Sequence, residues 1–99
     1  MNDMNTEIFE CEDSYEAEKL TGLLAVQKDN SIYVARVVGA VKNEIIIMLK
    51  DNSSHSVTLK DEKNAGRLGS LVEDVIKGRK AISECVSEDC SSQVKISTQ

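Results

Sequence analysis

Apolar residues near the middle of the chain follow the pattern of a strand with two apolar faces. The stretch NEIIIMLKD, residues 43–51, sets a run of apolar residues between polar ones. In a strand, Ile45 and Ile47 point to one side of the sheet, and Ile46 and Met48 point to the other. Both sides then need cover, and we expect a helix over one side and a partner molecule over the other.

Two further stretches beside this one are also typical of strands. Residues 31–41, SIYVARVVGAV, are rich in β-branched side chains, and residues 55–61, HSVTLKD, alternate apolar and polar positions as a sheet edge does. Polar turns at 42–43 and 51–54 separate the strands. The three strands predict an antiparallel meander. In the first strand, alternation places Ile32, Val34 and Val38 on one face and Tyr33, Val37 and Val41 on the other.

The clearest helical pattern follows these strands, over residues 64–82. Its apolar residues recur at intervals of three and four, which is the spacing of a buried helical stripe. They are Leu68, Leu71, Val72, Val75, Ile76 and Ile82. Asn64 is placed to cap the first turn, and Glu73 lies four residues before Lys77, so that their side chains can pair. We expect this helix to cover one face of the sheet.

The N-terminal third of the chain permits two interpretations. Residues 1–12 are expected to be loose or to form an edge strand. Residues 14–27 suit a helix, because Asp13 can cap it with Glu16 three residues later. The same region also suits a hairpin that turns at Asp29-Asn30. We favour the helix.

Together these elements predict an α+β fold. It comprises an antiparallel meander of three to four strands with a C-terminal amphipathic helix packed on one face, and a short N-terminal helix if residues 14–27 are helical. Residues 1–83 are expected to form a single domain. Residues 84–99 are polar and rich in serine, and we expect them to be a disordered tail.

Composition limits the chain to one small domain of 99 residues, with 40% hydrophobic and 29% charged side chains. With one Phe, two Tyr and no Trp, the core must be aliphatic, and rings on which unpaired bases could stack are scarce. The first ten residues lack the pattern of a signal peptide, no window suits a membrane span, and three cysteines is an odd number. We therefore expect a cytoplasmic protein with reduced thiols.

The formal net charge of −5 is unevenly distributed along the chain. Residues 1–30 carry −6, residues 31–63 carry +1, residues 64–83 carry +2 and residues 84–99 carry −2. Acidic ends therefore flank a mildly basic middle. Such ends commonly serve to keep a small protein in solution. They could also compete for a basic surface that normally holds nucleic acid.

Few residues are suited to catalysis or metal binding. His55 is the only histidine and is flanked by serines, which point away from it in a strand. Cys85 and Cys90 are separated by four residues, which is wider than the usual spacing of a metal or redox pair, and only Cys11 and His55 could complete a ligand set. We expect no catalytic residue, no metal and no cofactor.

Two glycines at the start of the predicted 64–82 helix could point to phosphate binding or to close packing. In KNAGRLGS, Gly66 and Gly69 lie beside Lys63 and Arg67, where free backbone N–H groups favour anions. The stretch matches neither the P-loop nor the dinucleotide fingerprint. We interpret the glycines as residues that let the helix approach the sheet closely.

The sequence predicts a binding protein rather than an enzyme. The order of helix, three strands and helix with an acidic balance resembles in outline the small secretion chaperones, and the size and acidity are similar to those of phage-encoded inhibitors of host defence. We expect an inhibitor or antitoxin-like adaptor, encoded by a phage or mobile element, that occludes a nucleic-acid-handling protein. Acidic residues would attract this target and apolar sheet residues would form the buried contact. The residues expected to bind the protein partner are Glu10, Glu12, Asp13, Glu16, Glu18, Tyr33, Ile46 and Met48.

Two alternatives stay open. The chain could be a nucleic-acid-binding module that uses the basic face of the 64–82 helix, although the excess of basic residues there is small. The residues of that alternative site are Lys63, Arg67, Lys77, Arg79 and Lys80. The chain could instead be a secretion-type chaperone or a homodimer, in which a twofold mate closes the uncovered sheet face.

Overall fold

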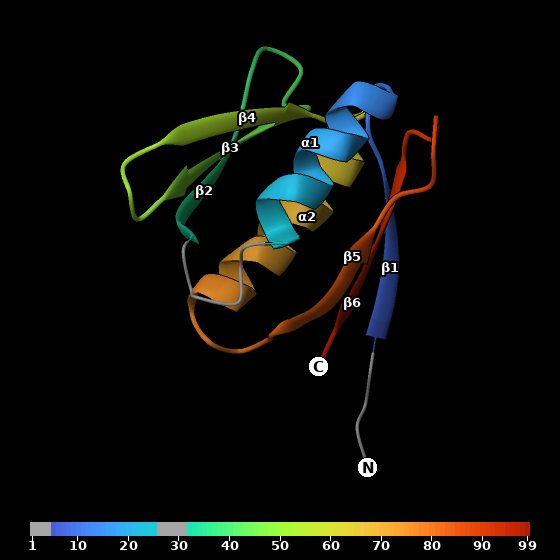
Figure 1. The fold of residues 1–99 in the computed structure, drawn as a ribbon. Coiled ribbons are helices and arrows are strands. Elements are labelled where there is room, and N and C mark those ends of the chain that lie inside the picture. The colour runs from blue at the N-terminus through green and yellow to red at the C-terminus, as the bar shows by residue number, and fades with distance from the viewer. Residues whose placement is uncertain (1–4, 26–31) are drawn as a thin grey trace.

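Within the residues that it describes, 5–25 and 32–99, the computed structural model contains two helices and six strands (Figure 1). In chain order these are β1 (Asn5–Glu10), α1 (Ser14–Ala25), β2 (Ile32–Val38), β3 (Glu44–Leu49), β4 (Ser54–Thr58), α2 (Glu62–Ile76), β5 (Ile82–Val86) and β6 (Gln93–Thr98). The predicted α+β class is confirmed. However, α2 lies in the middle of the chain rather than at its C-terminus, and the strands outnumber the predicted three or four.

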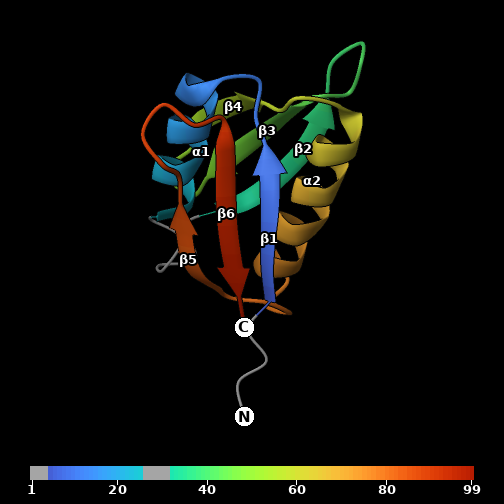
Figure 2. The same cartoon turned by 90° about the vertical axis from the view of Figure 1, so that its right-hand side faces the viewer.

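The six described strands form two antiparallel sheets of three. β2, β3 and β4 follow one another as the predicted meander. In the other sheet β6 lies between β1 and β5, so strands from the two ends of the chain pair side by side, with Asn5 opposite Thr98 (Figure 2). An isolated bridge between Cys11 and Leu59 links the two sheets.

The hydrophobic core lies between the two sheets, and the helices close its sides. In Figure 2 the β1–β6–β5 sheet is in front, the β2–β3–β4 sheet is behind it, and α1 and α2 stand on opposite sides. Elements from both sheets and both helices contribute side chains with 0% exposure: Phe9, Leu20, Ile47, Leu68 and Ile96. Each sheet therefore has an inner, buried face and an outer face.

Residues 84–99 were predicted to be a disordered tail, and this is wrong. They contain the second half of β5 and the whole of β6, whose Val94 and Ile96 are 0% exposed. The alternation in this segment spans only a few residues, which is too short to distinguish a strand from a polar tail. β6 is stabilised instead by pairing with β1 on one side and β5 on the other.

The N-terminal segment forms an edge strand, which was one of its two predicted states, and the helix that the sequence favoured. β1 is one of the two edge strands of its sheet. At the start of α1, the backbone N–H of Glu16 donates to Asp13 Oδ1 at 2.9 Å, as the predicted cap requires. The alternative turn at Asp29-Asn30 lies outside the described residues, but Leu23 and Leu24, which that hairpin would place in a strand, are helical.

α2 begins and ends earlier than the predicted helix over residues 64–82. Asp61, rather than Asn64, is the N-cap, and its carboxylate accepts the backbone N–H of Asn64 at 2.9 Å. After Ile76 the chain turns at Gly78, whose φ of +78° a glycine adopts without strain. Ile82, assigned by its spacing to the helical stripe, lies in β5. Among the described helices, none has the length and apolar character needed to cross a membrane.

The predicted division of β2 into two faces holds for Val34, Val37 and Val38 but is wrong for Ile32. A register shift between Ile32 and Val34 lets Ile32 pair with Leu49 while Val34 pairs with Met48. Because Met48 and Leu49 are adjacent in β3, Ile32 and Val34 point to opposite faces. A β-bulge of this kind cannot be recognised from alternation alone, since it adds one residue to the count.

Val37 and Val41 do not share one face of the sheet as predicted. Val37 points inward to α2, where a Cβ on Gly69 would lie 3.1 Å from Val37 Cγ2. Val41 lies in the turn after β2 and is 67% exposed. The close approach at Gly69 agrees with the interpretation of this glycine as a packing residue.

Candidate interaction surface

The outer face of the β2–β3–β4 sheet, called the outer face below, presents nine side chains in three rows. The pairing register places residues that lie opposite one another in the same row. The rows are Val34, Met48 and Ser54; Arg36, Ile46 and Ser56; and Val38, Glu44 and Thr58. Apolar side chains are thus concentrated on β2 and β3, and small hydroxyl side chains lie along β4.

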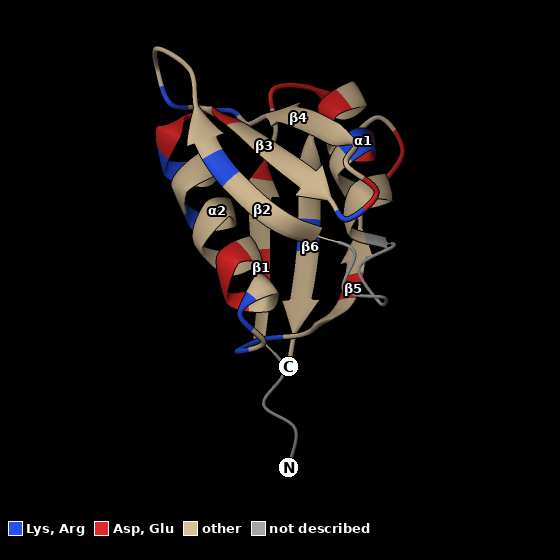
Figure 3. Cartoon of the chain, turned by 90° about the vertical axis from the view of Figure 1, so that its left-hand side faces the viewer, with Lys and Arg blue, Asp and Glu red and all other residues tan. Residues whose placement is uncertain are grey.

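In the described part of the chain, no helix or strand covers the outer face (Figure 3). Both helices lie on the inner side of the sheet, where Ile45 and Ile47 are 0% exposed. Ile46 and Met48, which point outward, are only partly buried. The structure therefore brings together two of the residues that were predicted to bind a partner. Tyr33, at the bulge of β2, is 41% exposed.

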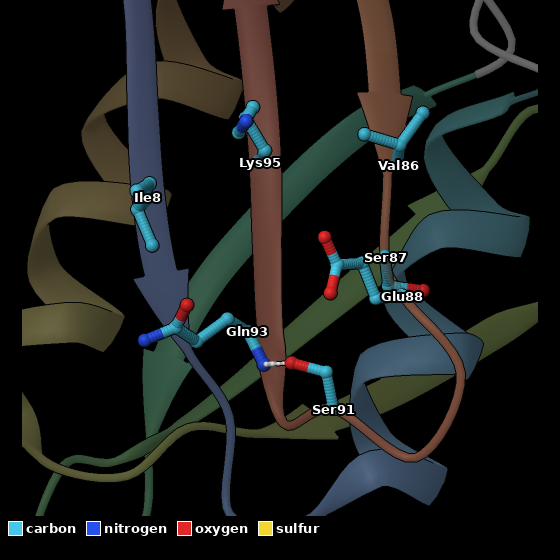
Figure 4. Close-up of a pocket in the computed structure, with 7 residues that line it drawn as sticks. All are labelled: Ile8, Val86, Ser87, Glu88, Ser91, Gln93 and Lys95. Atoms are coloured by element: carbon cyan, nitrogen blue, oxygen red, sulfur yellow. Dashed lines mark hydrogen bonds between the residues drawn. The ribbon is translucent and has the colours of Figure 1, made fainter.

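The outer side of the β1–β6–β5 sheet carries a shallow groove of about 200 Å³ (Figure 4). Lys95 of β6 lies between Ile8 of β1 and Val86 of β5. The β5–β6 loop closes one end with polar side chains, among them Glu88. The groove mixes apolar walls with single charges of both signs, so its lining does not select one class of ligand.

Three of the five acidic residues assigned to partner binding are used within the fold. Glu10 accepts hydrogen bonds from Lys60 Nζ at 2.9 Å and from Gln93 Nε2 at 3.0 Å. These bonds, Lys60 first, lower the pKa of the Glu10 carboxyl. Asp13 caps α1, and Glu16, discussed next, bonds β4. Glu12 and Glu18 remain exposed.

Two side chains of α1 form hydrogen bonds with β4 on the side where no strand pairs with it. The backbone N–H of Thr58 donates to Glu16 Oε1 at 2.8 Å, and Lys19 Nζ donates to the carbonyl of Ser56 at 2.9 Å. Glu16 and Lys19 also form an ion pair of 2.9 Å, and the Glu16 side chain is only 11% exposed. The two side chains satisfy a backbone N–H and a backbone carbonyl of β4 that could otherwise pair with a strand of another chain.

α2 bonds the outer edge of β1 in the same way. The backbone N–H of Glu10 donates to Asn64 Oδ1 at 3.0 Å, and Arg67 Nη2 donates to the carbonyl of Ile8 at 2.8 Å. The Arg67 guanidinium also lies 4.6 Å from the centre of the Phe9 ring. In both helices the acceptor and the donor are three residues apart, which places them on one side of the helix. Sequence reasoning missed both pairs.

The basic residues of the alternative nucleic-acid site are mostly paired. Ion pairs join Lys77 to Glu73 at 2.7 Å, Arg79 to Asp74 at 3.7 Å and Lys80 to Asp74 at 3.8 Å. Arg67 is bound to β1, as described above. Lys63 is exposed at the start of α2. Arg79 and Lys80 share one acid and Lys63 is exposed, so the pairing compensates part of the positive charge that a phosphate backbone would require.

His55 is arranged to stabilise a turn rather than to activate a nucleophile. Ser53 Oγ donates to Asp51 Oδ1, and His55 Nε2 lies 3.0 Å from the same Ser53 Oγ. The single hydroxyl hydrogen is engaged by the carboxylate, so the imidazole donates to Ser53 and cannot accept its proton. In a catalytic triad the histidine bridges the serine and the carboxylate, whereas here Ser53 bridges His55 and Asp51. The bonds from Ser53 lower the pKa of Asp51.

The three cysteines are free thiols that lie in different environments. Burial raises the pKa of Cys11 to about 12 and that of Cys85 to about 11, so both are protonated at neutral pH. Cys90 is exposed. Within residues 5–25 and 32–99, no group of His, Cys, Asp or Glu side chains is arranged to hold a metal ion.

A sequence signal could have identified these helix pairs. In each helix, two polar residues that are three positions apart lie beside the apolar stripe. Glu16 and Lys19 lie next to buried Ala17 and Leu20, so they border the stripe that faces the core.

Comparisons with protein-family models, with curated proteins and with solved structures find no match for this chain.

Proposed function

We propose that this chain is a non-enzymatic binding protein that contacts a protein partner through its outer face. The observation that carries the proposal is the position of Val34, Ile46 and Met48 side by side, with no described element over them. Contiguous apolar side chains with a polar rim are typical of protein interfaces. The protein would act by occluding the surface that it covers.

The charge of the chain favours a target with a basic surface. The net charge is −5, and Glu12 and Glu18 are exposed near the N-terminal end of α1. Long-range attraction would raise the association rate, while the outer face would supply the buried contact. Proteins that handle nucleic acid carry basic surfaces, so we infer an inhibitor or adaptor of such a protein.

Direct nucleic-acid binding has less support. Lys77, Arg79 and Lys80 are paired with acids of α2, and Arg67 is bonded to β1. The chain also lacks exposed rings in an array, since Tyr15 and Tyr33 lie on different elements. Among the described residues, the exposed rings therefore do not form the array on one surface that stacking of successive bases requires.

The proposal is tested with Met48→Asp and a matched control, Ile8→Asp. Both changes place a carboxylate on an outer sheet side, but Ile8 belongs to the other sheet, where it is 48% exposed. Each tagged protein would capture partners from a lysate of its native host, after nuclease treatment, with mass spectrometry as the readout. Circular dichroism would verify that each variant is folded.

We expect a protein captured by the wild type and by Ile8→Asp to be lost with Met48→Asp, because a desolvated carboxylate is unfavourable in an apolar contact. Met48→Thr, which preserves the preference for a strand, should weaken the same capture. Equal capture by all four proteins would show that the outer face is not the interface. Recovery of nucleic acid alone, without nuclease, would favour the basic face of α2.

A further inference from the structure

The outer face carries one positive and one negative side chain next to its central residue. Arg36 lies beside Ile46 on the neighbouring strand, about 4.8 Å away, and Glu44 lies two residues along β3, about 6.6 Å away. Neither of the two charged side chains takes part in an ion pair within the described residues. Both charges are thus available to a molecule that covers Ile46.

We propose that a second copy of this chain binds the outer face in a twofold-symmetric dimer. The proposal rests on the proposed function, because it takes the outer face to be an interface and names its occupant. Consider a twofold axis in the plane of the interface that passes over Ile46 and bisects the angle between the directions from Ile46 to Arg36 and from Ile46 to Glu44. Rotation about this axis exchanges those two directions. It therefore places Arg36 of each copy opposite Glu44 of the other.

The same rotation places the apolar residues in compatible positions. Ile46 meets its own counterpart on the axis, and Met48 of each copy meets Ser56 of the other. The strands of the two sheets then cross at about 90°, which is one of the two usual angles of sheet packing. The two distances from Ile46 differ by about 2 Å, which the flexible Arg and Glu side chains can span.

Charge favours a second copy over a target of one sign. A surface that is uniformly basic where it covers Ile46 would oppose Arg36, and a uniformly acidic one would oppose Glu44. A basic target of the proposed function would therefore need an acidic side chain opposite Arg36. A surface with the same two charges in exchanged positions satisfies both, and the chain itself is such a surface. Isologous contacts of this kind are the rule in homodimers.

The size of the outer face predicts a weak dimer. Three strands of about six residues cover roughly 15 by 20 Å, against about 800 Å² of accessible surface per partner in a standard interface. The dimer would therefore form in a concentration-dependent manner. A partner with a larger contact could displace the second copy, so the dimer is compatible with the proposed function.

The test uses two charge reversals, Arg36→Glu and Glu44→Arg, in the full chain. Sedimentation velocity would be measured from about 10 μM to about 1 mM, where an interface below the standard size dissociates. The wild type should dimerise in this range, and each variant alone should associate at least about tenfold more weakly, because both intermolecular pairs become repulsive. An equimolar mixture of the two variants should form a heterodimer as tight as the wild type, since each Glu then meets an Arg.

The mixture separates contacts between copies from contacts within a copy. The charges within each chain are unchanged by mixing, so only intermolecular pairing can restore association. Glu84→Arg and Lys95→Glu reverse exposed charges on the other sheet and should dimerise as the wild type does. A monomeric wild type, single variants that still dimerise, or a mixture that fails to associate would overturn the dimer. Loss of lysate capture with Met48→Asp would still support the proposed function in that case.

Discussion

At the scale of single residues, Glu16 shows how a charged side chain can belong to the fold. Glu16→Ala removes the acceptor of the Thr58 N–H and leaves that strand group without its partner on the edge of β4. We expect a loss of about 1–3 kcal/mol in the free energy of unfolding, because a part-buried donor loses a hydrogen bond to a charged acceptor. Urea denaturation would measure it. Glu18→Ala, two residues away and exposed, should change stability by less than about 0.5 kcal/mol.

Equal effects of the two substitutions would contradict this role of Glu16. The comparison also shows why sequence reasoning assigned Glu10, Glu12, Asp13, Glu16 and Glu18 together to partner binding. A run of carboxylates is alike in sequence, but Glu10 and Glu16 meet a lysine and a strand edge that lie far away in the chain. The cap at Asp13 is local, and the sequence predicted it. By contrast, Ile46 and Met48 could be predicted to face outward, because alternation alone decides the face of a regular strand.

At the scale of one element, α2 contains two glycines that the structure distinguishes. A Cβ on Gly66 would meet nothing within 4 Å, whereas a Cβ on Gly69 would lie 3.1 Å from Val37 Cγ2. Gly66→Ala should raise the free energy of unfolding by about 0.5–1 kcal/mol, since alanine restricts the unfolded chain and favours the helix. Gly69→Ala has the same helical advantage, but the contact with β2 should cancel or reverse it. Thermal unfolding of both variants would measure the difference.

Equal stabilisation of the two alanine variants would contradict the close contact between Gly69 of α2 and Val37 of β2. The existence of α2 and of the β2–β3–β4 meander could be predicted because periodicity extends over many residues in each. The ends of α2 could not, because Ile82 continues the helical spacing although Gly78 ends the helix. Helical and extended residues can share a spacing by chance over one turn.

At the scale of the whole molecule, the sheet that sequence reasoning missed depends on the most distant pairing in the chain. β1 and β6 come from opposite ends of the chain. The sequence offered β1 only as an alternative to a loose segment, and β6 is too short and polar to be recognised alone. The apolar residues of the two strands are recognised as core residues only when the strands are paired. The outer face of the other sheet could be predicted in part because its three strands are consecutive, so local turns define their pairing.

The decisive test of this architecture is whether the last residues contribute to stability. Ile96 is 0% exposed in the strand that lies between β1 and β5, while the neighbouring Lys95 points to the outer groove. Ile96→Ala should lower the free energy of unfolding by about 2–5 kcal/mol, the range for removal of a buried aliphatic side chain. Lys95→Ala should have an effect below about 0.5 kcal/mol. In a disordered tail both substitutions would be neutral, so urea denaturation of this pair separates a central strand from a tail.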